Sequence, residues 1–260
     1  MPTLEYNISE AVVDHKHPTR MSVAHILGQL APHDCAGMRK SRYGRLFDGG
    51  YVMADDFDGV TAAYSLGISH DVSWDLDIAN KGIKIFQYDH TINQLPAHHP
   101  HFTWEKTGIG ADHSEPGFKT LADIVAENSQ PGDRDLILKC DVEGFEWPIL
   151  ANCSTALLAR FRQIVIEVHA INALADPRHA DLIGRAVTNL STNHHVIHVH
   201  ANNYGAWAIL GSIPVPTVLE LTLLRKDRGS FQPTASEYPT PLDMPNNPER
   251  ADFPLGKFRF

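Results

Sequence analysis

The fold is decided by residues 136–150, which read Leu-Ile-Leu-Lys-Cys-Asp-Val-Glu-Gly-Phe-Glu-Trp-Pro-Ile-Leu. The apolar run predicts a buried strand, and two carboxylates, Asp141 and Glu143, follow it before Gly144. Because side chains alternate along a strand, Lys139, Asp141 and Glu143 are expected on one face. Ionisable groups at the end of a buried strand are costly unless they are paired or used. The stretch therefore predicts a ligand site at the carboxyl end of a parallel strand or, more simply, a Lys139–Asp141 ion pair beside a turn glycine.

A strand–turn–helix unit precedes this stretch. Residues 61–67 predict a strand that ends at Gly67, and residues 74–81 predict a helix that ends at a glycine. A second strand ends at Asp89, 22 residues after Gly67. This layout is that of a nucleoside-binding βαβ unit, in which the acid accepts hydrogen bonds from ribose hydroxyls. Since there is one glycine where such loops have two or three, an ordinary βαβ turn explains the pattern equally well.

The remaining predicted elements alternate between helices and strands, which is typical of an α/β domain. They are helices over 19–31, 121–128, 147–161 and 177–192, and strands within 46–53, 101–112, 162–169, 195–201 and 218–224. The pattern divides the chain into an N-terminal helical extension (1–44), which would be a cover or a substrate lid, a Rossmann-like domain (45–228) and a C-terminal arm (229–260). The arm holds six of the 17 prolines, so it is expected to be an extended arm or a partly disordered tail.

Composition narrows the possible partners and compartments. The formal net charge of −9 argues against a broad phosphate-binding surface, and therefore against a nucleic-acid partner. The three cysteines are far apart and lack metal-site spacing, which indicates a reducing compartment. Residues 1–10 show no signal-peptide pattern, and no stretch has the apolar length that spans a bilayer. We therefore expect a cytoplasmic protein with no membrane partner.

Four stretches together resemble the FkbM-type and related class I S-adenosylmethionine-dependent methyltransferases. They are Asp48-Gly-Gly-Tyr-Val, Tyr64-Ser-Leu-Gly-Ile-Ser, Lys139-Cys-Asp-Val-Glu-Gly-Phe-Glu and Ile166-Glu-Val-His. The resemblance spans roughly residues 45–225, and Asp-Val-Glu-Gly is its most specific part. It implies a Rossmann-like fold whose seven-stranded, mostly parallel sheet has one antiparallel strand and is flanked by helices. It also implies S-adenosylmethionine as cofactor and O-methylation of a sugar or small hydroxylated metabolite.

The resemblance also implies roles for single residues. Gly67 would let the backbone approach the cofactor, Asp89 would bind the ribose hydroxyls, and Asp112 would lie near the adenine. Asp141 would lie between the cofactor and the acceptor. The usual acid just before the first glycine is missing here, and Asp71 is the substitute candidate for the cofactor's amino group.

A hydroxyl acceptor needs a base or a metal ion to take its proton. His169 and His200 are the candidate bases, because both are expected near the carboxyl ends of strands beside Asp141. Other polar side chains are expected to converge with them: Glu143, Glu167, Asn202 and Glu220. Such a set could also bind a divalent cation.

Three other classes of function fit parts of the pattern. A nicotinamide-dependent oxidoreductase would share the βαβ unit, but its pyrophosphate needs the Gly-x-Gly-x-x-Gly turn that is missing here. A non-catalytic Rossmann-like binding or scaffold domain would explain the glycine-poor loop. A metal-dependent hydrolase would use the carboxylate and imidazole groups without binding an adenosyl ligand.

Overall fold

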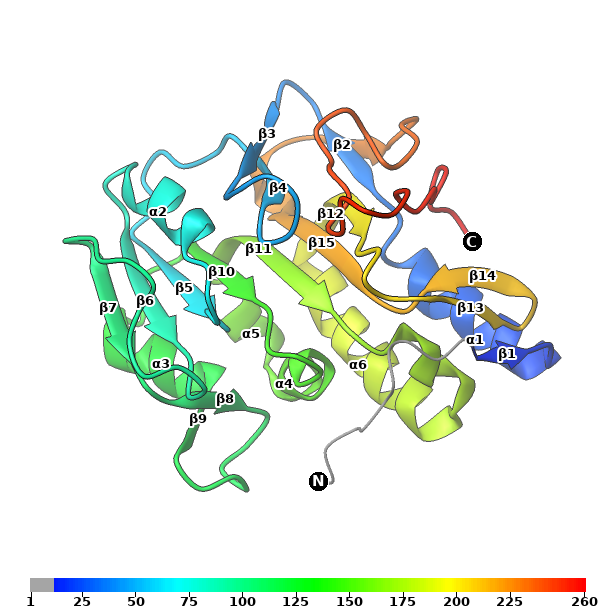
Figure 1. The fold of residues 1–260 in the computed structure, drawn as a ribbon, viewed down its shortest axis with the longest axis horizontal. Coiled ribbons are helices and arrows are strands. Elements are labelled where there is room, and N and C mark those ends of the chain that lie inside the picture. Colours follow the sequence, from blue (N-terminus) through cyan, green and yellow to red (C-terminus); the bar gives the residue numbers. More distant parts are fainter. Residues whose placement is uncertain (1–11) are drawn as a thin grey trace.

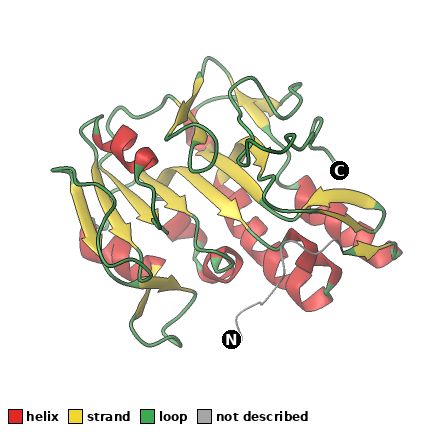
Figure 2. Ribbon diagram, in the orientation of Figure 1, coloured by secondary structure: helices red, strands yellow, loops and turns green. Residues whose placement is uncertain are grey.

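The computed structural model describes residues 12–260, so the expectation for residues 1–10 lies outside the described part of the chain. A seven-stranded sheet crosses the molecule (Figures 1 and 2). In spatial order its strands are β12 (His194–Ala201), β15 (Leu219–Arg225), β11 (Phe161–Val168), β10 (Leu136–Cys140), β5 (Ala62–Leu66), β6 (Lys84–Tyr88) and β7 (Phe102–Glu105). β15 runs antiparallel to both of its neighbours, β11 and β12, and the other neighbouring strands of this sheet pair in parallel. The predicted α/β fold with a large mixed sheet is confirmed.

One face of the sheet is covered by helices. They are α3 (Leu121–Asn128), α4 (Glu146–Asn152), α5 (Thr155–Leu158) and α6 (Pro177–Asn193), and α1 (His17–Gly28) packs against α6. Every second residue of the central strands, such as Leu66, Leu138 and Ile166, joins the main core on this side. The caps follow the sequence, since Thr120 and Asp123 form a capping box on α3. These helices hold the central strands in place from one side.

The other face is covered mainly by short elements. They are α2 (Ser73–Ala79) and the strand pairs β3 (Lys40–Tyr43) with β4 (Tyr51–Ala54), and β2 (His33–Cys35) with β16 (Phe231–Pro233). Side chains of the sheet hold the main chain of β4: Gln163 bonds both N and O of Ala54, and Thr222 donates to O of Val52. Because β3 pairs with β4, one hydrogen-bonded unit spans the predicted boundary at residue 45.

The sequence prediction does not distinguish several small elements as separate strands or helices. β1 (Val13–Asp14), β13 (Trp207–Leu210) and β14 (Ile213–Pro216) form a separate small sheet, and β8 (Gly108–Gly110) pairs with β9 (Phe118–Thr120). Two 3-10 helices, η1 (Ile171–Ala175) and η2 (Lys226–Arg228), follow β11 and β15. Each of these segments is too short to show a clear hydrophobic period.

The C-terminal segment after β16 contains little regular structure, yet it packs on the domain. Tyr238 and Phe258 belong to the main core. Nδ2 of Asn246 donates to Oε1 of Glu220 at 2.6 Å and to Oδ1 of Asp48 at 3.2 Å. The segment therefore joins β15 to the turn between β3 and β4. Within residues 12–260 no helix is both long enough and apolar enough to cross a bilayer.

Candidate active site

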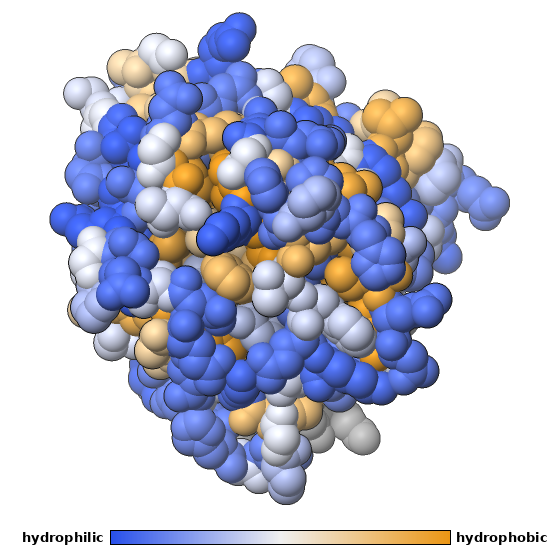
Figure 3. Space-filling view, turned by 90° about the vertical axis from the view of Figure 1, so that its left-hand side faces the viewer, coloured by the Kyte–Doolittle hydropathy of each residue, from blue (hydrophilic) through white to orange (hydrophobic). Residues whose placement is uncertain are grey.

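A cavity of about 320 Å³ opens at the carboxyl ends of β5, β6 and β10, the edge at which open α/β sheets bind ligands. The loops that follow these three strands form most of its wall, at 67–71, 88–91 and 139–145. The turn before β4 and residues of β8 and β9 complete the wall. Seen from the β7 edge, hydrophilic side chains cover most of the surface, and hydrophobic residues show in patches between them (Figure 3).

Gly67 lies at the point where two of these loops touch. Its φ is +79°, and a Cβ built on it would lie 1.7 Å from the main-chain O of Asp141. The amide of Gly67 donates to O of Tyr88, and its carbonyl accepts a 2.7 Å hydrogen bond from Nζ of Lys139. A glycine is therefore required here for both conformation and space.

Asp89 organises the loop that follows Gly67. Its Oδ2 accepts hydrogen bonds from the amides of Ile68 and Ser69 at 2.8 and 2.7 Å. Its Oδ1 accepts from the amide and the hydroxyl of Thr91 at 2.7 and 2.6 Å. Burial raises the pKa of Asp89, but the hydrogen bonds from Ser69, Thr91 and Ile68 outweigh it and keep the pKa below its usual value. Asp89 lines the cavity as an ionised carboxylate, and its ribose-binding role stays a prediction.

Asp71 also lines the cavity, at the start of α2. It accepts hydrogen bonds from the amide and the hydroxyl of Ser73 at 3.1 and 2.8 Å. Nε of Arg45 lies 3.6 Å from its Oδ2. The carboxylate thus faces the cavity with an arginine beside it, and its predicted contact with the cofactor's amino group stays a prediction.

Asp112 occupies a different place. It is exposed in the loop between β8 and β9 and lies outside the residues that line the cavity. Its Oδ1 accepts a 2.9 Å hydrogen bond from the amide of Ser114, so its side chain closes a turn. Ile109 and Phe118, which the sequence analysis did not single out, are the residues of β8 and β9 whose apolar side chains line the cavity.

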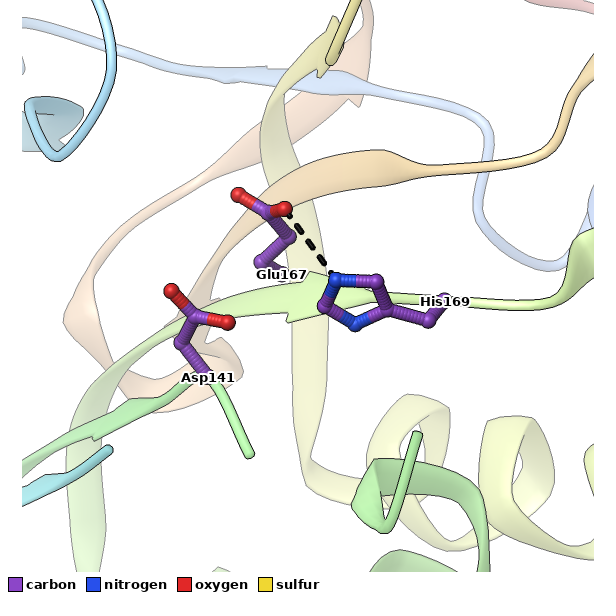
Figure 4. A group of neighbouring side chains, drawn as sticks. All are labelled: Asp141, Glu167 and His169. Carbon is purple, nitrogen blue, oxygen red and sulfur yellow. Dashed lines mark ion pairs between the residues drawn. The ribbon is translucent and has the colours of Figure 1, made fainter. Parts of the chain in front are cut away.

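Three side chains from the ends of β10 and β11 meet beside the cavity (Figure 4). Asp141 lines the cavity directly, and Glu167 and His169 lie beside it. One donor atom from each lies within 4.8 Å of the other two. Nε2 of His169 is 3.3 Å from Oε1 of Glu167, which also accepts a hydrogen bond from Nδ2 of Asn202. The predicted convergence of these side chains is therefore present in the fold.

A fourth residue, Glu146, fixes the orientation of His169. Its fully buried carboxylate accepts hydrogen bonds from the amides of Val142 and Gly144 and lies 3.1 Å from Nδ1 of His169. Nε1 of Trp147 donates to the carbonyl oxygen of His169 at 2.7 Å. Nε2 is thereby left to face Glu167. Glu146 was missed by the sequence analysis, although it is the last acid of the Asp-Val-Glu-Gly-Phe-Glu motif.

The protonation of this group follows from its burial. Desolvation raises the pKa of Asp141 above its usual value, although Lys139 and His169 oppose the rise. Desolvation also raises the pKa of Glu167, and the nearby Asp141 adds to the effect. For His169, burial lowers the pKa, but hydrogen bonds to Glu146 and Glu167 outweigh it and raise the pKa. When no cation occupies the group, these shifts favour a proton on the imidazole of His169.

His200 belongs to a separate group. Its Nδ1 lies 2.9 Å from Oε2 of Glu220, and its Nε2 lies 3.1 Å from both oxygens of Asp252 in the C-terminal segment. Burial lowers its pKa, but the hydrogen bonds to Asp252 and Glu220 raise the pKa to about 10. Both ring nitrogens are engaged, and the residue is not among those that line the cavity. This geometry favours a structural role.

The sequence comparison decides the family. A family model described as "Methyltransferase FkbM domain" matches residues 61–197, more than half of the chain. The chain belongs to the FkbM methyltransferase family. The matched segment runs from β5 into β12 and contains Gly67, Asp89, Asp141 and His169. The predicted family is therefore confirmed.

Two further comparisons add no residue roles to this FkbM methyltransferase domain. A precorrin-6y C5,15-methyltransferase from Geobacter metallireducens aligns with 86% of this chain and 100% of its own, at 11% identity and a TM-score of 0.32. Similarity at this level carries no argument about function. No curated protein matches the chain.

Proposed function

We propose that this FkbM methyltransferase uses S-adenosylmethionine to methylate a hydroxyl oxygen of a small acceptor such as a sugar. One observation supports this proposal above the others: Asp141 belongs both to the wall of the cavity and to the buried group with Glu167 and His169. A cofactor in the cavity and an acceptor at that group would thus meet at one carboxylate.

The residues of the cavity fit the chemistry of an adenosyl cofactor. Its volume of about 320 Å³ lies at the lower end of the range for small-molecule sites. The cofactor carries an amino group, a sulfonium and a ribose diol, and the carboxylates of Asp71, Asp89 and Asp141 line the cavity. Ile109 and Phe118 offer apolar surface for an adenine. Gly67, lacking a Cβ, lets the main chain of Asp141 approach the loop after β5, and it lines the cavity itself.

When bound, the cofactor supplies a methyl group on a positively charged sulfur. The protein has to align the acceptor hydroxyl and remove its proton. Because their pKa values are raised, Asp141 and Glu167 are suited to receive a proton near neutral pH. His169, held by Glu146, would orient the pair and balance its charge. His200 has no free ring nitrogen, so we leave it out of the proposed base.

Two rival functions differ from this proposal in what the cavity binds. A nicotinamide-dependent oxidoreductase would bind NAD, and a non-catalytic domain would bind a ligand without turnover. The single glycine in the loop after β5 argues against NAD, because close approach to a pyrophosphate requires several glycines.

Isothermal titration with S-adenosylhomocysteine, beside NAD as control, tests the proposal. Binding of the first ligand alone, followed by methyl transfer in a screen of hydroxylated acceptors, is the expected result. Failure of any adenosyl ligand to bind would refute the proposed function. Adenosyl binding with no turnover on a broad acceptor panel would favour the non-catalytic domain.

A further inference from the structure

The group of Asp141, Glu167 and His169 has the donor atoms and spacing of a metal site. Carboxylate oxygens and imidazole nitrogens bind divalent ions at about 2.0–2.2 Å, so donors on opposite sides of an ion are roughly 4.3 Å apart. One donor atom from each residue already lies within 4.8 Å of the others. Small side-chain movements would bring all three into contact with one ion.

Asp141 has an atom that the protein itself leaves without a partner. Its Oδ2 accepts a long hydrogen bond of 3.3 Å from the hydroxyl of Tyr51. Its Oδ1 is buried and accepts no hydrogen bond from any residue in 12–260. A buried carboxylate oxygen without a donor is costly. An ion at this group would satisfy it.

His169 is held as metal-binding histidines are held. Such a histidine directs one ring nitrogen to the metal and the other to a carboxylate or carbonyl, which fixes its orientation. Here Nδ1 lies 3.1 Å from the fully buried Glu146, and Nε2 faces Glu167. Amides of the loop after β10 occupy the remaining acceptor positions of Glu146, so its carboxylate is itself fixed.

The local charge also favours a cation. Within residues 12–260, the group and its immediate charged partners include four carboxylates and two basic side chains. The carboxylates are Asp141, Glu143, Glu146 and Glu167, and the basic residues are Lys139 and His169. Nζ of Lys139 is directed to the carbonyl of Gly67 and does not fill the space between the donors.

We infer that Asp141, Glu167 and His169 bind a divalent first-row transition ion, with Mn²⁺ as its simplest representative. Two carboxylate oxygens and one imidazole nitrogen are a mixed set of ligands, which suits metal ions that are neither strictly hard nor strictly soft. The inference deepens the proposed function, on which its catalytic meaning rests: the ion would hold the acceptor hydroxyl and lower its pKa. Because the ion would occupy Asp141 and Glu167, the proton lost from the O–H bond would pass instead to water through Glu143, whose exposed carboxylate lines the cavity.

The test is a titration of the full chain with Mn²⁺ in the absence of any adenosyl ligand. Electron paramagnetic resonance measures the concentration of free Mn²⁺ at each step. We expect one site per chain with micromolar affinity in the wild type. Glu167→Gln and Asp141→Asn should each weaken binding at least tenfold. Circular dichroism would reveal a folding defect in either variant. Because there are two isosteric variants, the test remains valid if one of them does not fold.

His198→Gln is the matched control. His198 is also a buried histidine paired with a carboxylate, since its Nε2 lies 2.7 Å from Oδ1 of Asp243, but it stands outside the three-residue group. Its variant should bind Mn²⁺ as the wild type does. Absence of a stoichiometric site in the wild type, or equal affinity in all variants, would overturn the inference.

The same samples separate this inference from the proposed function. If S-adenosylhomocysteine binds and methyl transfer continues after complete chelation, the metal site is refuted while the methyltransferase proposal stands. If Mn²⁺ binds at the three residues but no adenosyl ligand binds, the proposed function fails while the metal site stands.

Discussion

The main chain at Gly67 approaches that of Asp141 so closely that a Cβ at residue 67 would lie 1.7 Å from the Asp141 carbonyl oxygen. This contact joins the loop after β5 to the loop after β10, and so the wall of the cavity to the carboxylate group beside it. A hydrogen bond between the ends of β5 and β10 reinforces this contact, since the amide of Asp141 donates to O of Leu66 at 3.0 Å. The spacing of the two loops is thus set by the absence of a side chain.

Gly67→Ala is expected to damage both stability and ligand binding. Alanine at positive φ costs roughly 1–2 kcal/mol, and the collision with Asp141 adds to this. The affinity for S-adenosylhomocysteine should fall at least tenfold. Gly82→Ala is a matched control, because Gly82 has a φ of +84° but nothing within 4 Å of its built Cβ. Denaturant unfolding and calorimetric titration of both variants check the prediction. Equal ligand affinities would show that the close contact does not shape the cavity.

Asp89→Ala is expected to weaken adenosyl binding at least tenfold. Hydrogen bonds to a charged group are worth about 1.5–3 kcal/mol each, and about 1.4 kcal/mol corresponds to a factor of ten. The variant would also lose the bonds that hold the amides of Ile68 and Ser69, so some loss of stability is expected. Thr91→Val removes one donor to the carboxylate but keeps its charge, and should bind nearly as the wild type does. Unchanged calorimetric affinity in Asp89→Ala would remove this residue from the ribose role.

His169→Gln is expected to affect mainly turnover, and His200→Gln mainly stability. His169 orients the proposed bases Asp141 and Glu167, so its variant should lower kcat by up to the factor of about 10²–10⁴ that a positioned base contributes, while changing the affinity for S-adenosylhomocysteine little. His200 joins the C-terminal segment to β15 through Asp252 and Glu220, so its variant should lower stability more than kcat. Steady-state kinetics and urea unfolding of both variants separate these roles. A loss of kcat in His200→Gln alone would restore His200 as the candidate base.

The sequence predicts the sheet and its central strands well because their patterns are local. The apolar residues Leu136, Ile137 and Leu138 predict a buried strand, and the structure has one there. Its side chains alternate between the two faces of the sheet, as predicted for Lys139 and Cys140. The convergence of Asp141 with His169 follows from topology, because neighbouring parallel strands end at the same edge. For these residues, the position along a strand is enough to predict where the side chain lies.

Other parts of the site depend on packing between distant segments. His200 looked like a base from its place at a strand end, yet Asp252 reaches it from the C-terminal segment, 52 residues away along the chain. Tyr51 approaches Asp141 only because β4 is held on the sheet by side chains of β11 and β15. No local pattern encodes such contacts, so sequence reasoning could not separate the structural histidine from the one beside the cavity.

The attachment of the C-terminal segment is expected to weaken as pH rises above neutrality. The carboxylates that face His200 are Glu220, Asp252 and, farther away, Asp243, and His198 is a basic neighbour on the same strand. The carboxylates raise the pKa of His200 to about 10 in the folded protein, whereas an unfolded chain has a value near 6.5. Folding therefore strengthens proton binding. The resulting stabilisation is complete below about pH 6.5 and is lost as pH rises through about 10.

Urea unfolding of the wild type and of His200→Gln between about pH 6 and pH 10 checks this. Other groups titrate in both proteins, so the informative quantity is the difference between their free energies of unfolding. We expect this difference to be largest near pH 6 and to shrink steadily toward pH 10, because the wild type alone loses the charged pairs with Glu220 and Asp252. A difference that stays constant over this range would mean that His200 is not protonated in the folded protein, and that its two carboxylate partners hold it as a neutral ring.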